Sequence, residues 1–209
     1  MSYIGSKPAN KPVVASDLDP AVITGQTALA VAPADTDEFL ISDAGTLKRI
    51  DASLVGGGGI TMADQFRLAA DLTGTNAVIT ANLERVDDAS FAKIGTGMSV
   101  SSGVFSFPST GLYKITAKMA AIFDGPDNGY LNTEVTQNNS SYDLVGQTAG
   151  STDNTYQNDS SGAIFFNVTN ISNDKVRFVT ASFNTNSGLI GNTGQNTTYF
   201  EFIRLGDSQ

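Results

Sequence analysis

The sequence contains no cysteine and no histidine. Without cysteine the chain forms no disulfide and offers no thiolate ligand to a metal. Histidine is the commonest general base and metal ligand, so its absence excludes most hydrolase triads and structural zinc sites. From these two absences we expect a binding or structural protein without a cofactor, and not an enzyme.

Positive charge is also scarce. The chain has 12 Lys and Arg against 21 Asp and Glu, a formal net charge of -9, and no Lys or Arg occurs between Met119 and Asp174. Because nucleic-acid binding needs clustered cations to contact phosphates, this balance argues against a nucleic-acid partner. The N-terminal segment MSYIGSKPANKP has no apolar signal-peptide region, and no apolar run is long enough to span a bilayer. We therefore expect a soluble chain made in a cytoplasm, with no membrane insertion.

What the sequence does contain are short strand patterns separated by turn signals. Hydrophobic residues make up 40% of the chain, enough for a core, and 21 glycines favour turns over long helices. No segment after the glycine run at 56–59 has a helical period, so we predict an all-β sandwich or barrel. The predicted strands are Gln65–Ala69, Ala77–Val86, Phe91–Ile94, Met98–Val100, Gly103–Phe107, Gly111–Phe123, Tyr130–Gln137, Tyr142–Gly146, Gly162–Asn170, Lys175–Asn184 and Thr198–Leu205.

The most informative pattern joins two of these strands. Gly103–Phe107 meets a Pro-Ser-Thr-Gly turn, and the alternating strand Gly111–Phe123 follows. The segment resembles the signature hairpin of C1q/tumour-necrosis-factor-like jelly rolls, in which a G-x-F-x-x-P-x-x-G-x-Y phrase leads into a long core strand. The resemblance covers roughly Thr61 to Gly206. It implies a C1q/TNF-like jelly-roll sandwich that works as a trimer and binds ligands.

The last two predicted strands carry apolar residues on both faces, so both faces must be covered. In a two-sheet sandwich the opposing sheet covers one face, and the other needs a neighbouring subunit. C1q-like and TNF-like trimers pack these strands near the threefold axis, so the resemblance agrees with a homotrimer. The residues predicted for the trimer interface or core are Val176, Phe178, Tyr199, Phe200, Phe202 and Ile203.

The run Gly56 to Gly59 divides the chain into an arm (1–55), a glycine linker (56–59) and the jelly-roll head (60–209). Prolines spaced along the arm exclude regular helix and central strand. One element is predicted there, a β-hairpin of Glu38–Ser42 and Thr46–Ile50. A lone hairpin is marginal in water, so we expect partners to hold this extended arm. Its candidate attachment residues are Phe39, Ile41, Leu47 and Ile50.

The arm segments Ile23 to Leu29 and Pro33 to Ile50 resemble the N-terminal segments of bacteriophage tail-fibre and related virion appendage proteins. That resemblance implies that residues 2–55 attach the subunit to other virion proteins while the head faces outward. We therefore expect a virion structural protein, made in the host bacterial cytoplasm and serving as a short tail fibre for host attachment. A capsid decoration (cement) protein whose arm staples capsid subunits is the alternative. A secreted C1q-like lectin is a remoter one.

Candidate receptor-contact residues lie in Asn/Ser/Thr-rich loops that lack basic residues: Asp127, Tyr130, Tyr142 and Tyr156. Exposed tyrosine beside amides and hydroxyls suits contact with a host surface glycan or protein. The turn containing Asp124, Asp127 and Asn128 could supply oxygen ligands to calcium, as some C1q-like heads do. These residue types are also ordinary turn formers, which is the favoured interpretation.

A small acidic cluster, Glu84, Asp87 and Asp88, lies beside Arg85. Paired carboxylates serve glycoside hydrolysis, but charge at a strand end is routinely solvated. We therefore predict no catalytic residue.

Overall fold

The computed structural model describes residues 21–25, 27, 33–34, 36–55 and 59–209. The chain divides into two compact units, Met1–Gly58 and Gly59–Gln209, and the division falls inside the glycine run. In the described ranges, no helix is long and apolar enough to cross a membrane.

The first unit contains the predicted hairpin, which is confirmed. Strand β1 (Glu38–Asp43) pairs antiparallel with β2 (Thr46–Asp51), and Phe39 lies opposite Ile50. Ala44 and Gly45 have φ values of 49° and 83°, as a two-residue type I′ turn requires. The 3₁₀ turn Ala52–Leu54 follows β2.

The expectation that the arm holds no regular helix is wrong at one place. Residues Ala21–Thr24 form α1, a single helical turn, and the Gly25 amide donates to the Ala21 carbonyl over 2.9 Å. Proline disrupts the interior of a helix, and one turn is too short to have an interior.

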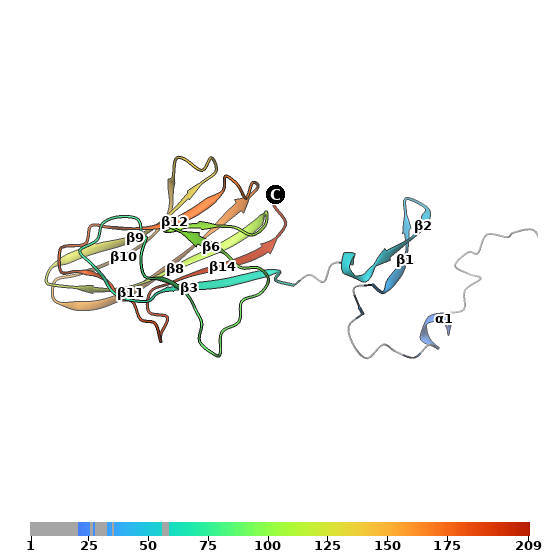
Figure 1. Ribbon diagram of the computed structural model, residues 1–209, viewed down its shortest axis with the longest axis horizontal. Helices are drawn as coiled ribbons and strands as arrows, with labels where there is room; N and C mark the ends of the chain where they lie inside the picture. The colour runs from blue at the N-terminus through green and yellow to red at the C-terminus, as the bar shows by residue number, and fades with distance from the viewer. Residues whose placement is uncertain (1–20, 26, 28–32, 35, 56–58) are drawn as a thin grey trace, which may run out of the picture. The chain divides into compact units, whose positions relative to one another are not determined.

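The second unit, the head, is a sandwich of two antiparallel sheets (Figure 1). The β9 sheet has the strand order β10-β9-β12-β7-β6. The β8 sheet has the order β4-β13-β8-β14-β3-β5, and β11 also pairs with β8. The strands are β3 (Met62–Leu68), β4 (Leu72–Thr73), β5 (Leu83–Arg85), β6 (Ser99–Ser101), β7 (Val104–Ser106), β8 (Gly111–Phe123), β9 (Asp127–Thr136), β10 (Asp143–Thr152), β11 (Tyr156–Val168), β12 (Lys175–Ala181), β13 (Gly188–Leu189) and β14 (Tyr199–Gly206).

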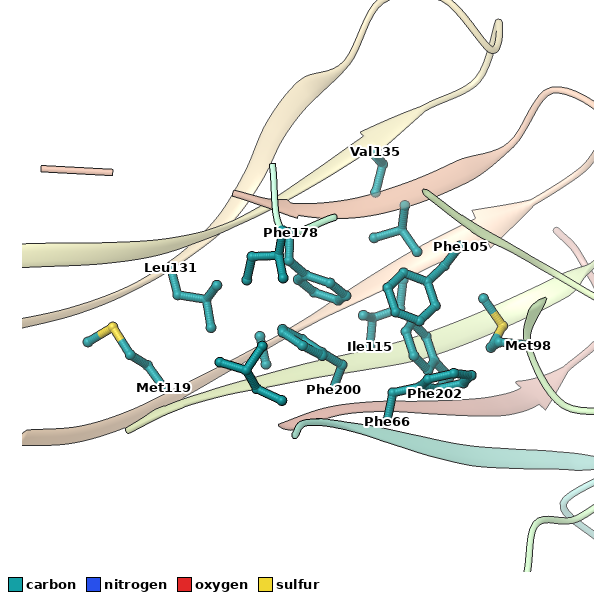
Figure 2. Packing of buried hydrophobic residues seen from close by; sticks show 14 of the residues in the cluster. Phe66, Met98, Phe105, Ile115, Met119, Leu131, Val135, Phe178, Phe200 and Phe202 are labelled. Atoms are coloured by element: carbon teal, nitrogen blue, oxygen red, sulfur yellow. The ribbon is translucent and has the colours of Figure 1, made fainter. Parts of the chain in front are cut away.

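The core lies between the sheets, and phenylalanine is its commonest residue (Figure 2). The ring of Phe105 lies 5.1 Å from that of Phe66, 5.1 Å from Phe202 and 5.6 Å from Phe178, centroid to centroid. The Phe178 and Phe200 rings stack at 4.0 Å. Edge and offset contacts of this kind add stabilisation beyond the burial of apolar area. This cluster joins β3, β7, β12 and β14 and fixes the two sheets on one another.

Two of the predicted strands are mostly loops. Within Ala77–Val86 only Leu83–Arg85 is a strand, and within Phe91–Ile94 only Ile94 makes a bridge, to Ala63. Ile79 is nevertheless fully buried, and its amide donates to the Phe178 carbonyl over 2.9 Å. The apolar residues of this segment therefore enter the core from a loop. Their sequence pattern is the same as that of a buried strand, so the sequence does not distinguish the two.

The polar stretch 147–161, expected to be largely loop, instead continues two long strands. β10 extends to Thr152, β11 begins at Tyr156, and each is paired along its length. The space between the inner faces of β10 and β11 is narrow. A Cβ at Gly146 would lie 2.8 Å from Ile164 Cγ2, and a Cβ at Gly162 would lie 3.1 Å from Thr148 Cγ2. Small residues are needed where two edge strands approach so closely, so the usual apolar alternation is missing.

The head has a base and a distal end. The chain enters beside the last strand, where Arg204 donates to Thr61 Oγ1 over 3.1 Å, and the C-terminus lies at this base (Figure 1). β8 runs from the base for 13 residues, about 40 Å of strand. It leads to the distal turns, where the Gly125 amide donates to Thr155 Oγ1 over 3.2 Å.

Candidate functional site

The outward side of β11, β8, β14 and β3, here called the outer face, carries a row of aligned residues. Phe165 pairs with Lys114, Lys114 with Ile203, and Ile203 with Ala63. Phe165 is 69% exposed. The inner side of the same strands is core, so this sheet presents apolar side chains in both directions. Phe165 is the most exposed apolar side chain of this row.

A cavity of 260 Å³ lies on the β14–β3 part of the outer face. Its lining includes Ala63, Phe91, Ala92, Glu201 and Ile203. Phe165 and this cavity lie on the same face, two to three strand spacings or about 10–14 Å apart.

The six residues predicted for interface or core separate into two groups. Tyr199 and Ile203 are half-buried on the outer face. The other four are at most 1% exposed and fill the core between the sheets: Val176, Phe178, Phe200 and Phe202. Strand alternation sends the side chains of those four residues toward the opposing sheet, so they belong to the core part of the prediction. Tyr199 and Ile203 are the two of the six on the surface of the head, and their place in a trimer interface stays a prediction.

The candidate attachment residues lie on the hairpin of the first unit. Phe39 is 41% exposed and Ile41 is 37% exposed, while Ile50 is half-buried opposite Phe39. Leu47 pairs with Ser42 through the backbone. The hairpin thus exposes apolar side chains that it does not cover itself.

The acidic cluster binds a buried arginine that the sequence analysis missed. Arg67 is 0% exposed, and its guanidinium donates to Glu84 Oε1 over 2.8 Å, to Asp87 Oδ1 over 2.7 Å and to Asp88 Oδ2 over 2.6 Å. These bonds hold the pKa of Glu84 below its ordinary value of 4.5, and a hydrogen bond from Thr193 helps. The cluster is a structural clamp. Arg67 lies directly opposite Glu84 in the pairing of β3 with β5, a contact that no local sequence pattern indicates.

Arg85, which the sequence places beside that cluster, pairs elsewhere. Its Nε donates to the buried Asp64 Oδ1 over 3.1 Å, and its guanidinium lies 4.8 Å from the Phe66 ring centroid. Asp64 Oδ2 also accepts from the Met98 amide over 2.8 Å. Two separate arginine–carboxylate contacts therefore hold the segment between β5 and β6 against β3.

The structure separates the candidate receptor-contact residues. Asp127 and Tyr130 lie at the distal end of β9, and Tyr156, 70% exposed, begins β11 at the same end of the head, opposite Phe123 of β8. Tyr142 lies at the base, where the Arg177 guanidinium covers its ring at 3.8 Å. The loops of these tyrosines contain no basic residue in sequence, and the arginine that covers Tyr142 comes from β12, a distant part of the chain.

Two adjoining cavities of 270 and 380 Å³, here called the distal groove, lie at the distal end and share Asn128 and Ser151. The first is also lined by Tyr130, Ala149, Gly150 and Asn158. The second is also lined by Pro126, Asp127, Thr152 and Asp153.

The two carboxylates that could serve as calcium ligands, Asp124 and Asp127, already accept hydrogen bonds from protein groups. Asp124 Oδ2 accepts from Asn186 over 2.8 Å, whereas Asp127 Oδ2 accepts from the Asn184 amide over 3.0 Å. Among the residues that the structure describes, no group of three or more acidic side chains could hold a metal ion.

Comparison with known proteins identifies the fold. No family model matches the sequence, and no curated protein matches it. Among solved structures, murine APRIL at pH 5.0 superposes with a TM-score of 0.52 at 11% identity, over 69% of this chain and 98% of that chain. Eiger TNF from S. frugiperda superposes with a TM-score of 0.51 at 14% identity, over 72% of this chain and 96% of that chain. The head is a C1q/TNF-like jelly roll. At these identities the likeness shows the fold alone.

Proposed function

We propose that this chain is a structural subunit of a tailed-bacteriophage virion. It forms a homotrimer whose arm attaches to other virion proteins and whose jelly-roll head, as a short tail fibre, contacts the host surface. The phage assignment is supported by the resemblance of the arm segments, which include the hairpin of β1 and β2.

The exposed phenylalanine on the outer face is the observation that supports a homotrimer. On this face Phe165 is 69% exposed beside Lys114, and Ile203 lies on the other side of Lys114, so a lone head leaves the phenylalanine ring in water. A neighbouring subunit that covers this row removes Phe165 from water, which stabilises the assembly by about 2 kcal/mol for each such side chain.

The two ends of the head suit different roles, attachment at the base and host contact at the distal end. The chain enters the head at the base, so the attached end of the subunit is the base, and the distal turns are free to face outward. Threefold presentation of a weak contact at that end raises avidity by orders of magnitude when all three copies can engage.

The proposed role is binding without catalysis. The carboxylates that resembled a catalytic group, Glu84, Asp87 and Asp88, are all hydrogen-bonded to Arg67. A general acid must present a carboxyl group to its substrate, and these three have a structural partner instead.

The number of copies per virion tests the proposal. Quantitative mass spectrometry of purified virions, scaled to the major capsid protein, should count tens of copies or fewer in a multiple of three. Hundreds of copies would refute the tail fibre and identify a capsid decoration protein. Light scattering of the full-length protein should give the mass of three chains, and a stable monomer would refute the homotrimer.

A further inference from the structure

The distal groove is formed by residues of three strands. β9 supplies Asn128 and Tyr130, β10 supplies Ala149 to Ser151, and β11 supplies Asn158. Gly150 makes this possible: a Cβ there would lie 2.8 Å from Asn158 Oδ1 and 3.1 Å from Met119 Cε. A larger residue at 150 would push the Asn158 side chain away from the position it takes beside the groove.

Tyr130 stands between two small neighbours on the outer side of the β9 sheet. It pairs with Ala149 of β10 on one side and with Ala181 of β12 on the other. Its hydroxyl accepts a hydrogen bond from Asn128 Nδ2 over 3.1 Å, which fixes the end of the ring. Alanine neighbours are too short to cover an aromatic ring from the side, so Tyr130 offers both an apolar surface and a polar tip.

The rest of the lining is amide, hydroxyl and carboxylate. Asn128, Ser151 and Asn158 provide donors and acceptors, and Asp127 and Asp153 provide acceptors. No Lys or Arg occurs between Met119 and Asp174, which includes every lining residue. A groove with this lining repels anionic ligands and matches a ligand rich in hydroxyl groups.

We propose that the distal groove binds an uncharged saccharide. The tyrosine ring packs against the apolar face of the sugar, and the side chains of Asn128, Ser151 and Asn158 hydrogen-bond its hydroxyls. This inference rests on the proposed function, in which the distal end of the head contacts the host surface, and it names the class of ligand at that contact.

Titration of the full-length ¹⁵N-labelled protein with methyl α-D-glucoside, methyl α-D-mannoside and methyl β-D-galactoside tests the inference. At least one of these sugars should shift the amide signals of Asn128, Tyr130 and Ser151. N-acetylneuraminic acid, which is anionic, should shift none of them. The Tyr130→Ala variant should bind the same sugar about tenfold more weakly, from the loss of an aromatic contact.

Gly150→Ala should also weaken binding, because the new Cβ displaces the Asn158 side chain from the groove. Tyr156→Ala is the matched control: this tyrosine is at the distal end and 70% exposed, yet it is absent from the lining of both cavities, so binding should be unchanged. The inference is overturned if no sugar shifts these amides, or if Tyr130→Ala binds as tightly as the wild type. Either result leaves the virion copy number and the trimer mass unaffected, so failure of the saccharide site is distinguishable from failure of the proposed function.

Discussion

Replacing Arg67 with methionine should destabilise the head by an amount that depends on pH. Arg67 is fully buried, but its partners are not: the side chains of Glu84, Asp87 and Asp88 are 29%, 75% and 42% exposed. Removing one partner of a fully buried ion pair costs about 3–5 kcal/mol. Because these carboxylates can regain water, we expect a smaller loss at neutral pH, about 2–3 kcal/mol.

Urea unfolding of the full-length protein measures this loss. With a slope of about 2 kcal/mol per M, the midpoint should fall by about 1–1.5 M at neutral pH. Wild type and variant must be compared at equal subunit concentration, because the stability of an oligomer depends on it. Arg67→Lys is the matched variant: it keeps the charge but loses the planar fork that reaches three carboxylates, so it should fall between the two.

The pH dependence tests the electrostatic cause. The pKa of Glu84 in the folded protein lies below its ordinary value of 4.5, so its ion pair stabilises the fold above that pH. This stabilisation is lost as the pH falls through the lowered folded value. The difference between wild type and Arg67→Met should therefore shrink in acid. A midpoint that moves by less than about 0.3 M, or a difference that is the same in acid, would refute the reasoning.

Three further predictions concern the core, a turn and the outer face. Phe105→Ala should cost about 3–5 kcal/mol in urea unfolding, because it opens a cavity among four aromatic rings; a cost below about 1 kcal/mol would contradict the central place of that ring. Gly103→Ala should lower the thermal midpoint of unfolding far more than Gly125→Ala. Both glycines have a φ of 79°, but of the two only a Cβ at Gly103 would meet a backbone oxygen, that of Ile79 at 2.2 Å. Equal effects of the two substitutions would refute the steric explanation. Phe165→Glu should yield folded monomers in light scattering, with Tyr156→Glu as the control that stays trimeric; a trimeric Phe165→Glu would place the interface elsewhere.

The sequence by itself determined the fold class and the firmest elements. Alternation along Gly111–Phe123 identified β8, and the glycine-containing turn Asp43 to Gly45 between two strand patterns identified the hairpin of β1 and β2. Both signals are local, since alternation and turn chemistry depend only on neighbouring residues. The sequence also ruled out thiolate and histidine chemistry by composition alone.

Only the tertiary structure decided which face each side chain occupies and which distant groups meet. Strand alternation placed Phe200 and Tyr199 on opposite sides, but the sandwich decided that Phe200 is core and Tyr199 is surface. The Arg67 clamp joins residues 17 to 21 positions apart, and Gly150 meets Asn158 across two sheets. The first contact follows from the pairing of β3 with β5 and the second from the packing of the two sheets, and no local pattern records which segment a side chain will meet.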